Sequence, residues 1–98
     1  MKKYAMMLMN PAFCPEKQKM VFLAGEIENL IVTVRTEQEA LEKVVELADA
    51  GVGVLELCGA FGKDLAERMY QTAEGRLCIG YVIYPKEQIE RLERYWEE

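Results

Sequence analysis

The sequence feature that most constrains the fold is an uninterrupted apolar run at residues 4–9, which reads Tyr-Ala-Met-Met-Leu-Met. Successive side chains of a β-strand point to opposite faces, so a run with no charged or amide residue predicts a strand buried on both faces. Such strands are typical of parallel sheets that helices cover. Asn10-Pro11 ends the run before it reaches the length of a signal-peptide core or a membrane span, so no membrane partner is expected.

Strand and helix patterns alternate along the rest of the chain. Further strands are predicted at residues 30–34, 52–57 and 77–83, where β-branched and other apolar residues cluster. Helices are predicted from Pro15 to Gly25, from Thr36 to Gly51, between Gly62 and Gly75, and from Pro85 onward. Thr36 and Glu39 have the spacing of a capping box. The pattern predicts one α/β domain over residues 1–98, in the order βαβαβαβα, with a four-stranded, mostly parallel sheet.

Two strand orders fit this pattern. In a flavodoxin-like order, 2-1-3-4, helices cover both faces of the sheet. In a half-barrel order, 1-2-3-4, all helices lie on one face and a second copy of the chain must cover the other. The apolar first strand favours the flavodoxin-like order.

Composition excludes several classes of function. The chain has 12 Lys and Arg against 17 Asp and Glu, a net charge of −5, and no basic stripe, so nucleic acid is not an expected partner. With 51% hydrophobic residues in 98, it carries much apolar surface for its size, which predicts a homodimer. Three aromatic residues near the C-terminus, Tyr84, Tyr95 and Trp96, fit an exposed patch for such a contact or for a ligand.

The chain contains neither His nor Ser. This excludes Ser–His and Cys–His catalytic pairs and His-ligated metal sites built from this chain. Its cysteines, Cys14, Cys58 and Cys78, are scattered and one short of a four-thiolate zinc site. An odd, scattered set predicts reduced thiols and a cytoplasmic protein, with no metal and no cofactor.

The best place for a site is the carboxyl end of the sheet. In the 2-1-3-4 order, the loops at 10–14 and 58–62 follow adjacent strands and meet there. The second loop has two glycines and leads into a helix N-terminus, whose free N–H groups suit a small anionic or polar ligand; an ordinary βα turn is the alternative interpretation. The expected ligand-binding residues are Asn10, Cys14, Cys58, Gly59, Ala60, Phe61, Gly62 and Lys63.

Glu56 is the one charged residue inside a strand predicted to be buried. A buried carboxylate must pair, accept hydrogen bonds or change its pKa, so Glu56 is a candidate general base for a lyase or isomerase. The alternative is a structural ion pair with Arg76 or Arg35. Such a pair, together with a large apolar interface, would indicate a non-catalytic oligomeric interaction module.

Two of the cysteines fall in these loops. Cys58 precedes a helix N-terminus, which lowers a thiol pKa, but no His is present as a base, so a small packed side chain is favoured for Cys58 and Cys14. A close approach of the two sulfur atoms would instead allow a thiol switch.

Residues 51–62 read Gly-Val-Gly-Val-Leu-Glu-Leu-Cys-Gly-Ala-Phe-Gly. This segment resembles a family of small prokaryotic proteins of unknown function that carry a Glu-Leu-Cys-Gly-Gly-Phe-Gly signature. Ala60 stands where that signature has its second Gly. The resemblance implies an α/β fold and a shared loop, and it implies no activity.

Overall fold

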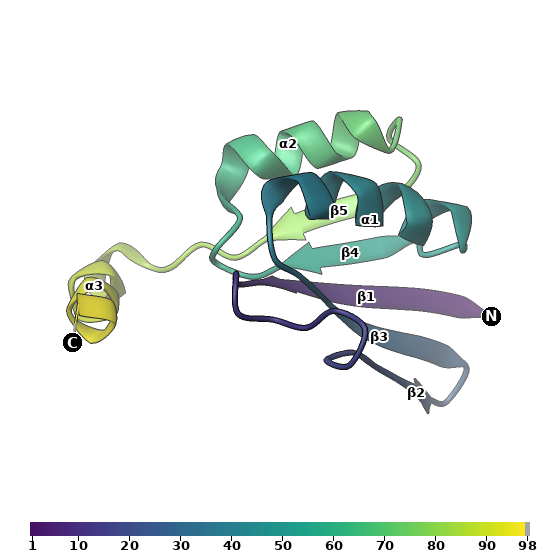
Figure 1. Ribbon diagram of the computed structural model, residues 1–98, viewed down its shortest axis with the longest axis horizontal. Helices are drawn as coiled ribbons and strands as arrows, with labels where there is room; N and C mark the ends of the chain where they lie inside the picture. Colours follow the sequence, from purple (N-terminus) through teal and green to yellow (C-terminus); the bar gives the residue numbers. More distant parts are fainter. Residues whose placement is uncertain (98) are drawn as a thin grey trace.

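The computed structural model describes residues 1–97, which form a sheet of five strands, three α-helices and one 3-10 turn (Figure 1). The strands are β1 (Lys2–Met9), β2 (Met20–Ala24), β3 (Ile27–Val34), β4 (Val54–Leu57) and β5 (Cys78–Tyr81). The helices are α1 (Glu37–Asp49), α2 (Gly62–Thr72) and α3 (Ile89–Glu97), and the 3-10 turn η1 (Lys86–Gln88) precedes α3.

The strand order is β2-β3-β1-β4-β5. β1 pairs in parallel with β3 on one side and with β4 on the other, and β5 continues the parallel set beside β4. These four strands are the four that the sequence predicts, and their order is the predicted 2-1-3-4. The α/β class and the mostly parallel sheet are therefore confirmed.

The fifth strand, β2, corrects the prediction of a helix from Pro15 to Gly25. Met20–Ala24 pairs antiparallel with β3, through a hairpin whose turn is Gly25-Glu26. Gly25 has a φ of +62°, the left-handed conformation that tight hairpins require at such a position. The apolar residues of Met20–Ala24, predicted to form one face of a helix, therefore belong to an edge strand. A turn of two residues joins antiparallel strands, so β2 runs opposite to β3.

Replacing that helix by β2 leaves one face of the sheet without helices. α1 and α2 lie side by side on the same face (Figure 1). On that face the paired residues Ala5 and Leu55 are fully buried. On the other face their neighbours Tyr4 and Val54 pair as well, yet Val54 is 41% exposed. The expectations of helices on both faces and of a doubly buried first strand are therefore wrong.

The core lies between the sheet and the two helices. Its largest fully buried side chains are Met7, Val34, Val44, Leu55, Leu57 and Met69. At the start of α1, the Thr36 hydroxyl accepts the N–H of Glu39, as the capping box predicts. The return bond goes one residue further back, since the Glu39 carboxylate accepts the N–H of Arg35 at 2.8 Å.

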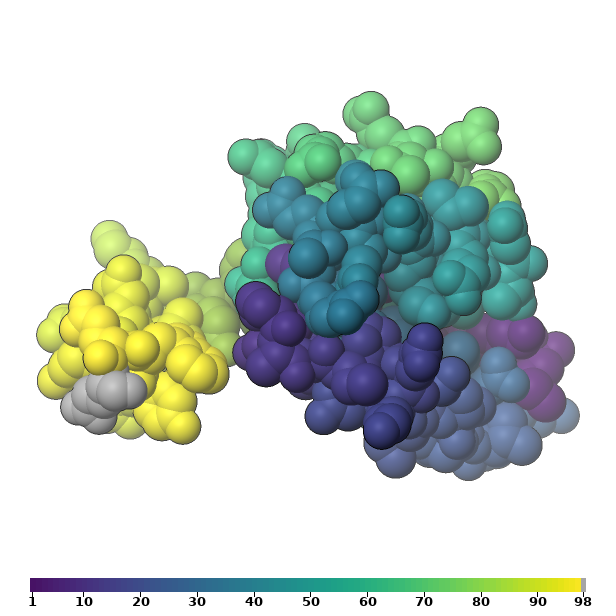
Figure 2. Space-filling model, viewed as in Figure 1, coloured from purple at the N-terminus to yellow at the C-terminus, as the bar shows by residue number. Residues whose placement is uncertain are grey.

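The C-terminal segment stands away from this body. After β5 the chain runs through residues 82–85 to η1 and α3, which lie beyond the carboxyl ends of the strands (Figure 1). Figure 2 shows this segment as a separate lobe on a narrow neck. No residue of α3 is buried, although its apolar residues recur on one side. Among residues 1–97, no helix has the length and apolar character to span a membrane.

The β2–β3 hairpin can be tested at its turn. We expect Gly25→Ala to lower the free energy of unfolding by about 1–2 kcal/mol, because a Cβ is disfavoured at positive φ. Gly53→Ala is the matched control: Gly53 lacks a positive φ, and a Cβ there meets no atom within 4 Å. Urea denaturation of both variants measures the difference, and equal stabilities would contradict this turn geometry.

Candidate functional site

A cavity of about 530 Å³ opens at the carboxyl ends of β1 and β4. Its walls come from the ends of these strands, from the loops that follow them, and from the C-terminal segment. The lining residues are Leu8, Met9, Asn10, Phe13, Cys58, Gly59, Ala60, Tyr84, Leu92 and Trp96. The two loops meet there because β1 and β4 are adjacent and parallel, so both strands deliver their loops to one edge of the sheet.

Four of the predicted ligand-binding residues line this cavity: Asn10, Cys58, Gly59 and Ala60. The other four lie elsewhere. Phe61 is only 7% exposed and packs in the hydrophobic core, so its ring holds the loop against the body of the protein. Gly62 and Lys63 are exposed at the start of α2, and neither lines the cavity. Cys14 lines a different cavity.

The loops leave hydrogen-bond donors available at the cavity. The Asn10 side-chain oxygen accepts the N–H of Ala12 at 2.8 Å, and within residues 1–97 the Asn10 amide nitrogen donates no hydrogen bond. In the second loop the N–H of Cys58 bonds to Met7, and the carbonyl of Cys58 accepts the N–H of Phe61. Within residues 1–97 the intervening N–H groups, those of Gly59 and Ala60, have no partner. Three donors thus remain for a ligand that carries acceptor oxygens.

Three aromatic rings complete the cavity, from Phe13, Tyr84 and Trp96. A Cβ on Gly59 would lie 3.4 Å from Cε1 of Tyr84, so the loop and this ring are in close contact. Trp96 is 75% exposed and packs edge-on against Tyr95, with ring centroids 5.1 Å apart. Tyr84 and Trp96 were marked in the sequence as aromatic residues of an exposed patch. Phe13 was not among the expected ligand-binding residues, although it lies in the 10–14 loop that the sequence placed here, and nothing in the sequence indicated Leu92.

Glu56 lies on the helix-free face of the sheet, outside the lining of this cavity. Its carboxylate accepts the hydroxyl of Tyr4, the neighbouring side chain on β1. The prediction that Glu56 is buried is wrong. Only one face of β4 packs against helices, and Glu56 is exposed on the other face. The hydrogen bond to Glu56 raises the pKa of Tyr4 above its ordinary value of 10.0, with smaller contributions from burial and from the Glu56 charge.

The ion pairs proposed for Glu56 are also wrong. Arg76 pairs with Asp49 at 2.7 Å, and Arg35 pairs with Glu39 at 2.6 Å. Both arginines therefore bind carboxylates at the ends of α1, on the opposite side of the sheet from Glu56.

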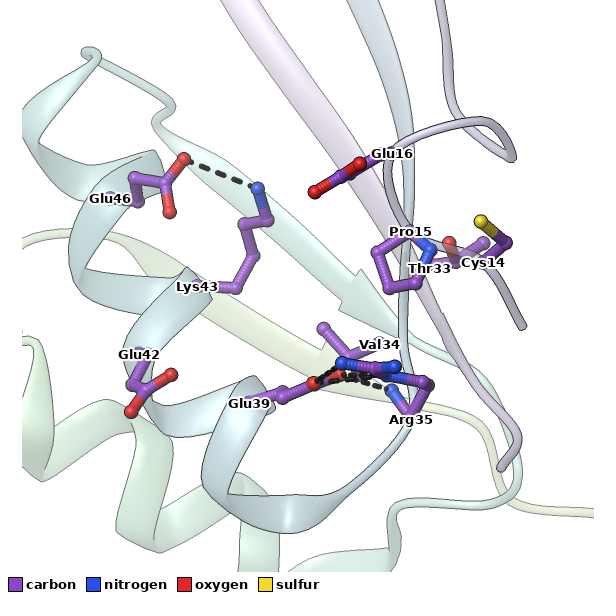
Figure 3. Close-up of a pocket in the computed structure, with 10 residues that line it drawn as sticks. All are labelled: Cys14, Pro15, Glu16, Thr33, Val34, Arg35, Glu39, Glu42, Lys43 and Glu46. Atoms are coloured by element: carbon purple, nitrogen blue, oxygen red, sulfur yellow. Dashed lines mark hydrogen bonds and ion pairs between the residues drawn. The ribbon is translucent and has the colours of Figure 1, made fainter. Parts of the chain in front are cut away.

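A second cavity, of about 360 Å³, lies between α1 and the loop after β1 (Figure 3). Its two basic groups already pair with carboxylates: Arg35 with Glu39, and Lys43 with Glu46 at 3.2 Å. The Arg35 guanidinium and backbone N–H hold the pKa of Glu39 below its ordinary value. Glu16 and Glu42 add unpaired acidic groups to the wall, so this cavity does not suit an anion.

The cysteines are separate in the structure. Cys14 lines the second cavity, Cys58 lines the first, and all three cysteines are free thiols. In the described part of the chain, no three His, Cys, Asp or Glu residues gather as a metal ion requires.

Comparison with known proteins identifies a family. A family model described as a family of unknown function, DUF6506, matches residues 2–97, and the chain belongs to this family. No curated protein and no solved structure matches the chain. The resemblance seen in the 51–62 segment, to a family of unknown function, is thus confirmed.

The pair on the helix-free face can be tested by alkaline titration. A raised folded-state pKa means that the protonated Tyr4 stabilises the fold below pH 10, and that this contribution is lost as the pH rises through the folded-state value. We expect Glu56→Gln to lower the pKa of Tyr4 toward its ordinary value. Tyrosinate absorbance of the wild type, Glu56→Gln and Tyr4→Phe measures it. If Tyr4→Phe removes no late-titrating step, the pair does not form as described.

Proposed function

We propose that this member of the DUF6506 family binds a small molecule with a flat apolar body and an acceptor group, in the cavity at the carboxyl ends of β1 and β4. One observation carries the proposal. The residues that line one cavity include three with aromatic rings and three with N–H groups that have no partner within residues 1–97. Apolar walls with a few placed polar groups are the usual composition of a small-molecule site.

The size of the cavity supports a ligand of metabolite size. Small-molecule sites enclose roughly 300–1,000 Å³, and about 530 Å³ lies within that range. Phe13, Tyr84 and Trp96 offer faces and edges for stacking on a planar group. The unpartnered N–H groups of Gly59 and Ala60 are next to these rings in the lining.

The acceptor group is best supplied by a carboxylate or a carbonyl. No charged side chain lines the cavity, so recognition of a negative charge depends on N–H donors rather than on an ion pair. Backbone N–H groups before a helix N-terminus favour such oxygen atoms, and α2 begins directly after this loop. The sequence predicted a small anionic or polar ligand, and we now propose that this ligand also has an aromatic body.

Binding has more support here than catalysis. Glu56, the proposed general base of a lyase or isomerase, is not among the residues that line the cavity, and its carboxylate accepts the hydroxyl of Tyr4. The ionisable side chains in the lining are those of the half-buried Cys58 and of Tyr84, and no Asp, Glu, Lys or Arg lies beside them in the lining.

The proposal is tested by blocking the cavity at Gly59. Gly59 lacks a positive φ, so Val is allowed there, and its methyl groups would push into the Tyr84 ring and the cavity. We expect flat aromatic carboxylates, such as benzoate and indole carboxylates, to stabilise the wild type and not Gly59→Val. A ligand at 100 times its Kd adds about 2.7 kcal/mol, and each kcal/mol raises Tm by roughly 4–8 °C in a domain of this size.

Trp96 supplies an independent signal. It is the single Trp of the chain and lines the cavity, so a bound aromatic acid should quench its emission or shift it to the blue. Gly53→Val is the matched control, because Gly53 also lacks a positive φ and lies outside this cavity. The control should respond like the wild type. Equal responses in both variants would place binding elsewhere, and no response in the wild type to any aromatic acid would overturn the proposal.

A further inference from the structure

We infer that the helix-free face of the sheet is the interface of a homodimer, in which a second copy of the chain packs its own helix-free face against it. The composition of the chain predicted a homodimer, and this inference proposes which surface forms its interface. This inference does not rest on the proposed ligand, because the cavity described above meets the face only at its carboxyl end, through Leu8.

The pairing register identifies the side chains on this face. Residues paired across neighbouring strands point the same way, so Tyr4, Met6 and Leu8 of β1 define it. β3 adds Ile31, β4 adds Val54, and β2 adds Met20 and Phe22. Val54, Phe22 and Met20 are 41%, 47% and 54% exposed, whereas Ala5, Met7 and Leu55 on the helix-covered face are fully buried. Parallel sheets are ordinarily covered on both faces, so a second layer is missing from the single chain.

The charges on this face favour a second copy as that layer. The chain as a whole has a net charge of −5, and α1 alone carries five acidic residues against one basic residue. On the helix-free face, by contrast, β1 to β5 place one base, Lys2, and one acid, Glu56. A two-fold dimer brings one surface against itself, which requires a surface without an excess of one charge. This face meets that requirement, and each copy supplies one cation for each carboxylate.

The extent of the face allows a dimer contact. The five strands contain 29 residues, which at about 3.3 Å per residue and about 4.8 Å between strands give a plan area of roughly 450 Å². This flat area is over half of the ~800 Å² of accessible surface that each partner buries in a stable complex. Only the carboxyl end of the face is covered. The loop after β1 covers Thr33, whose hydroxyl donates to the Gln18 carbonyl, and α3 makes its element contacts chiefly with η1.

Two substitutions of the same kind test the interface. Val54 and Val21 are both exposed strand residues, but Val54 points to the helix-free face and Val21 to the other. We expect light scattering after gel filtration to give the wild type the mass of two chains of 11.3 kDa each. Val54→Lys should give the mass of one chain, and Val21→Lys should remain a dimer.

Cysteine labelling of the unmodified protein gives a second measurement, which holds even if Val54→Lys fails to fold. Cys78 pairs with Val54 and shares its face, whereas Cys14 lies on the loop after β1; both are exposed in the single chain. In the dimer Cys78 should react with iodoacetamide at least tenfold more slowly than Cys14, as mass spectrometry of the peptides would show.

Three results would overturn the inference. The first is a wild type with the mass of one chain, which would leave the face to a different partner. The second is a dimer that persists in Val54→Lys to the same extent as in Val21→Lys, which would place the interface elsewhere. The third is a dimer in which Cys78 reacts as fast as Cys14, since the face would then be open to solvent.

Discussion

The pairing of β1 with both β3 and β4 is the constraint on which the rest of this structure depends. β1 is matched along its whole length by β3 and over Tyr4–Met7 by β4. This parallel pairing aligns the carboxyl ends of the strands, and therefore brings the loop after β1 to the loop after β4. It also sets Ala5 and Met7 in one row with Leu55 and Leu57, where α1 and α2 bury all four. The core and the cavity are thus two consequences of one register.

The second determining feature is the hairpin of β2 and β3. A flavodoxin-like chain connects its first two parallel strands through a helix on the second face of the sheet. Here the connection returns along the edge as β2, so that face receives no helix. The exposure of Glu56, its hydrogen bond with Tyr4, and the apolar surface around them follow from this one difference. Because Glu56 lies exposed on this face, we assign it to the proposed dimer interface and not to a catalytic site.

The cavity combines two parts of different origin. Its polar side is fixed by the fold, because Asn10 and the Cys58–Gly59–Ala60 turn are held by backbone hydrogen bonds to the sheet. Its aromatic side comes largely from the C-terminal segment, whose helix α3 buries none of its residues. Burial of apolar rings is what α3 lacks in the single chain, and a flat ligand between Trp96 and the loops would supply it.

The sequence by itself predicted the four parallel strands and the capped start of α1, because periodicity and caps act locally. It favoured the observed order over a half-barrel order, and with that order it predicted that the loops that carry Asn10 and Gly59 meet. It also marked Tyr84 and Trp96 as aromatic residues without a core position. Only the tertiary structure decided that residues 20–24 are a strand, since an apolar run of that length fits a helix face and an edge strand equally well until Gly25 adopts its turn. That choice left one face of the sheet without helices and so exposed Glu56. Burial depends on which elements cover which face, and no local pattern encodes that.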